Sequence, residues 1–486
     1  MGELTVVTGL FVSGWTFGML TGLSAVGALM FSFIAGLSLA ISVGATLLFL
    51  GLPTEPLFVW VAACGLPFAV MLITAWRPGG HEPETLARRL TVLAFGLICA
   101  AVVVYAMRHV AIVKYHSDTF RYLRSALLFA KGETEFITLN DLGKRLYTFP
   151  ISLSLARIFD EYYIKSLIPT LSLGVLATSL FFFWALTERE AIRRKERIVI
   201  AVLMLLLIIS NNRYVWNSFY LNTHLYIAAC VMIIAAAGAM NERSTGVPQS
   251  FLVAIQLLML PPLVLGRAEG FLLGGLAVLP FVLNGAAPRR DRIAVLIGFG
   301  AMTLSWHAYL ALAHLRADRD LPLSALGPTA LGVAAIFAAP LLTAPLLSRF
   351  RRPLLGLAEA GLWLVLAVAA LYEPDIFLGS LDATFQNVVI GAGSWGRSLV
   401  VLTGIVIFTL SFCKDRRLAT LRFPVTAAIP MFFLLAFVRD GGSYRVGNGD
   451  SLNRMLIEIF PLSVLYVAVA ATSTEWTAPF RRRSRD

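Results

Sequence analysis

The stretch KYHSDTFRYLRSALLFAKGE, residues 114–133, places an acid at the start of an amphipathic segment. A carboxylate such as Asp118 can serve as a general base that takes a proton from an attacking hydroxyl. It can equally be the N-cap of a helix that begins at Thr119. Both interpretations stay open at this point, and the neighbouring Tyr115 and His116 are candidates for the same site.

Arginines in later segments are candidates for binding phosphate. The planar guanidinium contacts phosphate oxygens bidentately and stays charged, so Arg445 and Arg454 are candidate ligands, with anchoring to lipid headgroups as the alternative. Arg267 lies two residues before Glu269 in a short polar turn. We expect a local ion pair there, with a phosphate-binding role for Arg267 as the alternative.

The segment NNRYVWNSFYLNTHLY, residues 211–226, is rich in amides and aromatic residues. Such side chains suit sugar hydroxyls and ring faces, which makes Asn217, Asn222 and His224 candidate substrate-binding residues. Within a membrane, polar groups also pair between helices. A hydrogen bond between helices is therefore the competing interpretation for Asn222 and His224.

These residues must be positioned by membrane helices. The chain has 486 residues, of which 58% are hydrophobic and 14% are charged, whereas soluble domains average about 25% charged residues. A spanning helix needs roughly 20 apolar residues. We predict an all-α, polytopic transmembrane bundle of about 13–15 spans. Apolar runs predict spans near 5–26, 29–51, 56–75, 90–113, 166–186, 198–210, 220–240, 249–264, 271–286, 293–313, 322–347, 354–372, 396–413, 423–438 and 455–473.

Most basic residues form short clusters on one side of this arrangement, and that side is cytoplasmic by the positive-inside rule. The opposite, external side receives the segments 114–165, 211–219, 265–270, 314–321, 373–395 and 439–454. Acids, amides, aromatic residues and arginines gather there, which predicts a polar site at the external interface. The composition favours a multi-pass protein of the bacterial inner (plasma) membrane, with its site facing the periplasm.

The largest external loop, 114–165, contains two predicted interfacial amphipathic helices. In the first, over 119–131, the apolar residues recur at helical spacing and Gly132 ends the helix. The second covers 141–163, and Pro150 is expected to break it.

Several segments resemble the GT-C superfamily of integral-membrane glycosyltransferases. HSDTFRYLRSALLFAKGE (116–133) resembles the acidic motif that opens the first large external loop of that family, and LGRAEGFLLGGLAVLP (265–280) is similar to its Arg-x-Glu-Gly turn. NVVIGAGSWGRS (387–398) and GDSLNRMLIEIFPLSVLYVA (449–468) resemble its late polar loops. Two differences stand out. The acidic loop follows the fourth predicted span rather than the first, and a second acid beside the first is not obvious.

The resemblance implies transfer of a hexosyl or pentosyl group from a polyprenyl-phosphate donor to a lipid, glycan or protein acceptor, by inverting displacement. It implies Asp118 as the base, and Arg454, Arg445 and Arg267 as ligands of the donor phosphate. Glu269, Trp395 and Asp450 join the candidate substrate-binding residues. The partners expected are the donor, the acceptor and membrane lipids, without nucleic acid. No cofactor is required by these residues, and a divalent cation remains an open alternative.

The motifs also imply a domain organisation, in which residues 1–89 are additional N-terminal helices and 90–486 form the catalytic core. Two other function classes stay open. One is a glycan polymerase or ligase that uses lipid-diphosphate glycans, and the other is a lipid or glycan transporter without chemistry. A transporter would place ionisable residues at mid-membrane depth, whereas the predicted charges lie near the two interfaces.

Overall fold

The computed structural model describes residues 2–73, 101, 105, 117–141, 147–241, 245–320, 323–438, 441–447 and 451–476. These residues form helices and no strand, apart from one isolated bridge between Cys413 and Trp476. The prediction of an all-α fold is therefore confirmed for the described part of the chain.

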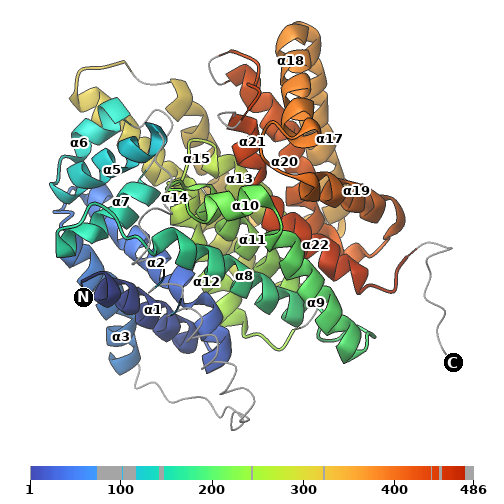
Figure 1. The fold of residues 1–486 in the computed structure, drawn as a ribbon, viewed down its shortest axis with the longest axis horizontal. Coiled ribbons are helices and arrows are strands. Elements are labelled where there is room, and N and C mark those ends of the chain that lie inside the picture. The colour runs from blue at the N-terminus through green and yellow to red at the C-terminus, as the bar shows by residue number, and fades with distance from the viewer. Residues whose placement is uncertain are drawn as a thin grey trace.

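The helices follow one another along the whole chain (Figure 1). They are α1 (Gly2–Leu20), α2 (Ala25–Leu50), α3 (Pro56–Ile73), α5 (Ser117–Ala130), α6 (Thr134–Phe136), α7 (Thr148–Ser154), α8 (Leu167–Leu186), α9 (Arg194–Ile209), α10 (Asn212–Asn217), α11 (His224–Met240), α12 (Gln249–Val264), α13 (Gly270–Val282), α14 (Arg289–Arg316), α15 (Leu323–Leu342), α16 (Pro345–Arg349), α17 (Arg351–Tyr372), α18 (Pro374–Phe385), α19 (Arg397–Phe412), α20 (Ala419–Val438), α21 (Ser451–Leu456) and α22 (Phe460–Ala471). Short 3₁₀ and π segments lie at Ile137–Asp141, Leu155–Phe159, Gln386–Ile390 and Arg416–Leu418.

Helices occupy the predicted spans, but fewer of them have the length of a membrane crossing. The predicted span 90–113 lies almost wholly outside the described residues, and each of the other fourteen overlaps a helix. Within the described residues, six helices are long and apolar enough to cross a membrane. Several others are short: α22 has 12 residues, which at about 1.5 Å per residue falls well below a hydrocarbon core of roughly 30 Å. The structure thus supports a membrane protein, and the number of 13–15 spans remains a prediction.

Helix α11 lies at the centre of the bundle. Every one of its residues from His224 to Met240 is buried, and it packs against α8, α12, α13, α20 and α22. A helix that is apolar on all sides is expected in such a position. Figure 1 shows α1 to α3 on one side of α11 and α17 to α22 on the other. The first residue of this central helix, His224, is polar, and it belongs to the candidate site described below.

The N-terminal helices share the core of the rest of the chain. Gly14 of α1 and Gly36 of α2 let the two backbones approach closely, and a Cβ at either position would collide with the partner helix, as is usual for small residues between membrane helices. The carboxylate of Glu3 accepts hydrogen bonds from the backbone and hydroxyl of Ser166, at 2.8 and 2.7 Å. Helix α2 also packs on α7, α8 and α12. The domain boundary at residue 89 remains a prediction.

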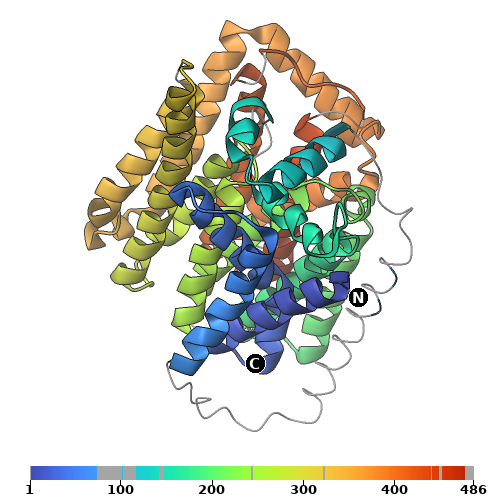
Figure 2. The ribbon, with the colours of Figure 1, turned by 90° about the vertical axis from the view of Figure 1, so that its left-hand side faces the viewer.

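A helix, α5, covers most of the first predicted helical segment of the long loop, and its place at a membrane interface remains a prediction. Helix α5 ends at Ala130, and Gly132 has a φ of +78°. The backbone N–H groups of Gly132 and Glu133 donate to carbonyls of the last helical turn, which is a Schellman type of ending. Tyr122 and Phe129 face the protein, whereas the Phe120 side chain is 62% exposed. Figure 2 shows α5 above α1 and α2.

The second helix of the loop differs from its prediction. Residues 142–146 lie outside the described part, and the described helix, α7, is buried on all sides rather than interfacial. The backbone N–H of Thr148 donates to the carbonyl of Leu265 at 3.0 Å, and its hydroxyl donates to that of Pro262 at 2.8 Å. These bonds satisfy carbonyls at the end of α12 that have no partner within that helix. Pro150 does not break α7 because it lies in the first turn, where a missing N–H removes no helical bond.

Hydrogen bonds join loops at each end of the bundle. At one end, Asn211 donates to the hydroxyl of Ser398 at 2.9 Å, and Asn387 accepts from the backbone of Gly447 at 2.6 Å. Asn211, Asn387 and Gly447 lie in segments predicted to be external, and Ser398 lies at the start of the predicted span 396–413. At the other end, Arg417 binds Glu190 at 3.1 Å, which joins segments predicted to be cytoplasmic. These contacts agree with the predicted grouping of the segments, and which side of a membrane each end faces remains a prediction.

Candidate functional site

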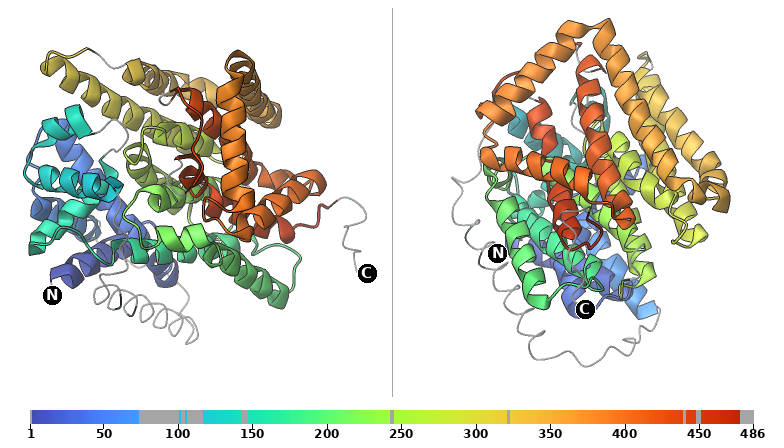
Figure 3. Two further views of the ribbon diagram at one scale, coloured as in Figure 1. Left: turned by 45° about the horizontal axis from the view of Figure 1, so that its top comes forward. Right: turned by 90° about the vertical axis from the view of Figure 1, so that its right-hand side faces the viewer.

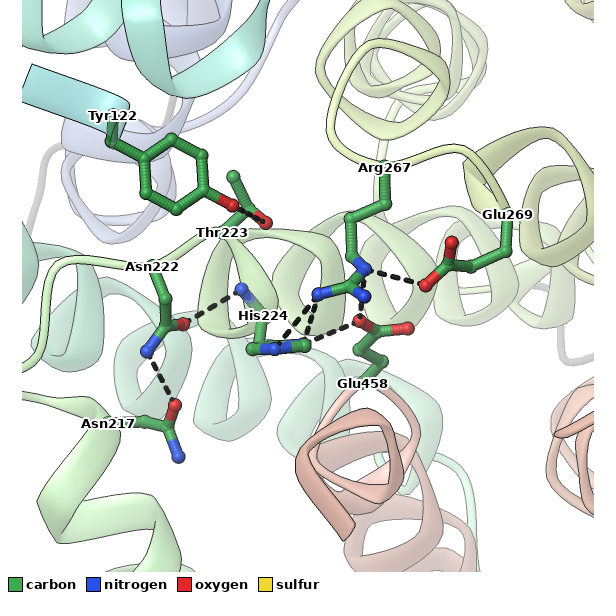
Figure 4. A network of polar contacts seen from close by, with 8 residues as sticks. All are labelled: Tyr122, Asn217, Asn222, Thr223, His224, Arg267, Glu269 and Glu458. Carbon is green, nitrogen blue, oxygen red and sulfur yellow. Dashed lines mark hydrogen bonds and ion pairs between the residues drawn. The ribbon is translucent and has the colours of Figure 1, made fainter. Parts of the chain in front are cut away.

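A network of buried polar side chains joins four segments that are distant in the sequence (Figure 4). The segments are the turn between α12 and α13, the start of α11, the turn between α21 and α22, and helix α5. Arg267, His224 and Glu458 form the centre of the network. Their side chains are 10%, 2% and 0% exposed, so the charges are almost completely removed from solvent.

Arg267 forms the ion pair that its spacing predicted. Its Nε lies 2.6 Å from Oε1 of Glu269 and 3.7 Å from Oε1 of Glu458. Burial by itself lowers the pKa of the guanidinium, but the adjacent Glu269 and Glu458 carboxylates outweigh it and raise the pKa above its usual value. The arginine therefore stays charged, and it holds the turn after α12 against the turn before α22.

His224 lies between Arg267 and Glu458, and its contact with Glu458 assigns a proton to one ring nitrogen. Nη1 of Arg267 lies 3.0 Å from Nε2 and 3.4 Å from Nδ1 of His224, so the guanidinium lies against the face of the imidazole ring. Nδ1 lies 2.7 Å from Oε1 of Glu458, and a carboxylate can only accept a hydrogen bond. We therefore assign a proton to Nδ1 of His224.

Two asparagines extend the network along the segment 217–224. Oδ1 of Asn222 accepts from the backbone N–H of His224 at 3.0 Å and so satisfies a donor at the start of α11 that lacks a helical partner. Nδ2 of Asn222 donates to Oδ1 of Asn217 at 2.8 Å, and Asn217 donates to the carbonyl of Arg213 at 2.7 Å. Both asparagines are buried and engaged with protein groups. These bonds agree with the competing interpretation, in which Asn222 and His224 serve helix packing.

Helix α5 reaches the network through Tyr122. The hydroxyl of Tyr122 lies 3.3 Å from the hydroxyl of Thr223, the residue before His224. Asp118 belongs to the first turn of α5, one turn before Tyr122, and its side chain lies outside the described part of the structure. Residues four positions apart lie on the same face of a helix. The backbone of α5 therefore places position 118 on the helix face that carries Tyr122.

The other predicted site residues lie in different parts of the chain, and not all of them are among the described residues. Tyr115, His116 and Asp450 lie outside the described residues. Arg454 is half-buried on α21, one turn before Glu458. Arg445 is exposed, and its carbonyl accepts from Nδ2 of Asn387 at 2.9 Å.

Trp395 is fully buried, and its ring lies 6.1 Å from that of Phe460. In this structure it packs the loop before α19 against α22, so it presents no ring face to a sugar. The structure brings together Arg267, Glu269, His224, Asn222 and Asn217, whereas Trp395 and Arg445 take no part in the network.

Three members of the network were missed in the sequence: Glu458, Tyr122 and Thr223. Glu458 had a usable signal, because it is an acid inside the apolar run MLIEIFPLSV, and ionisable residues within membrane segments are rare and generally paired. Tyr122 had none, since an aromatic residue on an amphipathic helix is expected to pack. Among the described residues, no group of three or more His, Cys, Asp or Glu side chains is arranged to hold a metal ion.

An apolar cleft of about 510 Å³ lies beside the network, between α17, α18, α19, α20 and α22. Leu456, Ile459 and Phe460 line its wall and flank Glu458 in the sequence. Figure 3 shows the face formed by α17 to α22. The volume falls within the usual range for small-molecule sites, roughly 300–1,000 Å³.

The comparisons with known proteins identify no relative. No family model, no curated protein and no solved structure matches this chain.

Proposed function

We propose that this protein is a membrane glycosyltransferase that moves a sugar from a polyprenyl-phosphate donor to a lipid, glycan or protein acceptor at the external interface. One observation carries the proposal. The buried network holds the two helices that bear Asp118 and Arg454, because Tyr122 follows Asp118 by one turn and Glu458 follows Arg454 by one turn.

Asp118 is the general base in this proposal. Its carboxylate takes the proton from the acceptor hydroxyl as the oxygen attacks the anomeric carbon. The bond from that carbon to the donor phosphate breaks on the opposite side, which inverts the configuration. The phosphate leaves with negative charge, and Arg454, with Arg445 on the adjacent exposed loop, supplies the charge-assisted contacts that stabilise it.

Arg267 has a different part in this proposal from Arg454. Its Nε and Nη1 already bond to Glu269 and His224, and Glu458 lies within 3.7 Å. Two neighbouring carboxylates weaken the attraction of this arginine for a third anion. We therefore assign Arg267 to positioning the turns around the site, and assign the donor phosphate to the more accessible arginines.

The direct test is binding and transfer with purified protein in lipid nanodiscs. Radiolabelled polyprenyl-phosphate hexoses and pentoses are the donors, and a lipid and glycan extract of the native membrane supplies acceptors. We expect saturable binding of one donor and transfer of its label. Binding of a lipid-diphosphate glycan, with no binding of any monophosphate donor, would instead identify a polymerase or ligase.

A further inference from the structure

A second cavity, of about 480 Å³, lies at the opposite end of the bundle from the buried network. It is formed where α17 and α20 begin and where α19 and α22 end. Four cations line it, together with one carboxylate and the ring of Tyr466. The cations are Arg352, Lys414, Arg416 and Arg422. A concave site that combines this many cations with apolar walls has the chemistry of an anion-binding site.

The acids near this pocket are already engaged. The side chain of Asp415 is completely buried and accepts from Arg417 at 3.0 Å and from Ser473 at 3.0 Å. Arg422 pairs with Glu359 at 3.3 Å. Asp415, the one carboxylate that lines the pocket, is therefore neutralised by Arg417, which does not line it. The pocket keeps an excess of positive charge.

The remaining three lining cations are Arg352, Lys414 and Arg416. All three side chains are exposed at the end of the bundle, where they can reach a headgroup in the interfacial region. Basic pockets between membrane helices on the cytoplasmic side commonly bind anionic headgroups. The predicted orientation puts this end of the bundle on that side.

The pocket borders the apolar cleft, because Leu410 lines both cavities. The Arg422–Glu359 pair also spans the boundary, because Arg422 lines the pocket and Glu359 lines the cleft. A charged cavity thus lies next to an apolar one along the helices, and this order of polarity matches that of a phospholipid.

We propose that the basic pocket binds the phosphate headgroup of an anionic phospholipid, and that an acyl chain of the same molecule lies in the apolar cleft. The cations contact the phosphate, and burial of the acyl chain in the cleft contributes to the affinity, so that a headgroup without a chain binds weakly. Phosphatidylglycerol represents this class. The proposal does not depend on the glycosyltransferase activity, because the cations that bind the phosphate lie at the opposite end of the bundle from the buried network.

The test uses the full-length protein, purified in detergent, and measures binding of dioleoyl-phosphatidylglycerol and dioleoyl-phosphatidylcholine by native mass spectrometry. We expect phosphatidylglycerol to bind more tightly, and glycerol phosphate alone not to compete with it. The triple variant Arg352→Gln, Lys414→Gln, Arg416→Gln should bind phosphatidylglycerol at least ~10-fold more weakly, since each cation contributes to the attraction.

A matched control removes the same number of charges at the same end of the bundle, outside the pocket. Arg193, Arg194 and Lys195 are exposed residues just before and within the first turn of α9, and their change to Gln should leave the affinity nearly unchanged. Equal affinities for the two lipids, or equal losses in the two triple variants, would overturn the proposal. Competition by glycerol phosphate would also do so, because it would identify a site for small anions.

The acyl chain has a separate test that leaves every charge in place. Leu410→Trp fills the junction of pocket and cleft and should weaken phosphatidylglycerol binding about as much as the triple variant does. Leu364→Trp is its control, since Leu364 is 65% exposed on α17 and outside both cavities. Unchanged binding by a folded Leu410→Trp variant would exclude the cleft. If the triple variant fails to fold, the proposal is still tested by the comparison of the two lipids on the wild-type protein and by the variants Leu410→Trp and Leu364→Trp.

Discussion

Nδ1 of His224 lies 2.7 Å from Oε1 of Glu458, although the two residues are 234 positions apart in the sequence. The first residue of the central helix α11 is thereby joined to the turn that precedes α22. Arg267 contacts both partners, at 3.0 and 3.7 Å. Polar groups at such depth must be paired to persist, so this contact holds several loops of one end of the bundle in place.

Removing the carboxylate of Glu458 should strongly destabilise the fold. Glu458→Ala leaves the N–H of His224 and part of the charge of Arg267 without a buried partner, and breaking a buried pair costs about 3–5 kcal/mol. Glu458→Gln should cost less, because the amide oxygen can still accept from Nδ1. Thermal unfolding in detergent measures both, with the exposed Glu133→Ala as the control. Equal stability of Glu458→Ala and Glu133→Ala would contradict the assigned network.

The contact with Glu458 predicts a proton on Nδ1 of His224. At pH 7 this nitrogen should be protonated. Nitrogen-15 NMR of protein labelled in its histidines distinguishes the two ring nitrogens. His224→Gln identifies the resonance among the six histidines of the chain. An unprotonated Nδ1 would mean that the ring does not donate to Glu458.

Asp118 is predicted to be the catalytic base. Losing a base typically lowers the rate by ~10²–10⁴-fold, so Asp118→Asn should nearly abolish transfer while donor affinity stays close to that of the wild type. Asp160→Asn, at an exposed acid of the same loop, is the matched control. Asparagine caps a helix about as well as aspartate. Normal turnover by Asp118→Asn would therefore assign Asp118 to capping alone.

Arg454 is predicted to bind the donor phosphate. A hydrogen bond to a charged group contributes about 1.5–3 kcal/mol, and every 1.4 kcal/mol is tenfold in affinity. Arg454→Ala should therefore weaken donor binding roughly 10- to 100-fold, as measured with radiolabelled donor. Arg157→Ala removes an arginine that pairs with Asp160, and should leave donor affinity unchanged. A wild-type affinity in Arg454→Ala would remove this residue from the donor site.

The distribution of basic residues predicts from which side of the membrane each loop position is accessible. Single cysteines at 140 and at 194, 290 and 417 should react with a membrane-impermeant maleimide from opposite sides of the membrane, with 140 external. Sealed vesicles of known orientation provide the measurement. Labelling of 140 and 194 from the same side would overturn the assignment of the site to the external face.

The sequence by itself determined the class of fold and the position of most helices. Long uncharged runs such as 4–54 can only be satisfied as helices in an apolar medium, and each predicted span within the described residues is occupied by a helix. The Arg267–Glu269 pair was also predictable, because both residues lie in one short turn. Local spacing is sufficient for features of this kind.

Only the tertiary structure decided the rest. Glu458 meets His224, and Tyr122 meets Thr223, through contacts between segments far apart in the chain. Helix α7 is buried because the orphan carbonyls of α12 bind Thr148, although its sequence reads as an interfacial helix. Hydrophobic periodicity indicates that one face of a helix is shielded from water. That face can contact either lipid or another helix. Which of the two it meets depends on long-range packing that no local pattern contains.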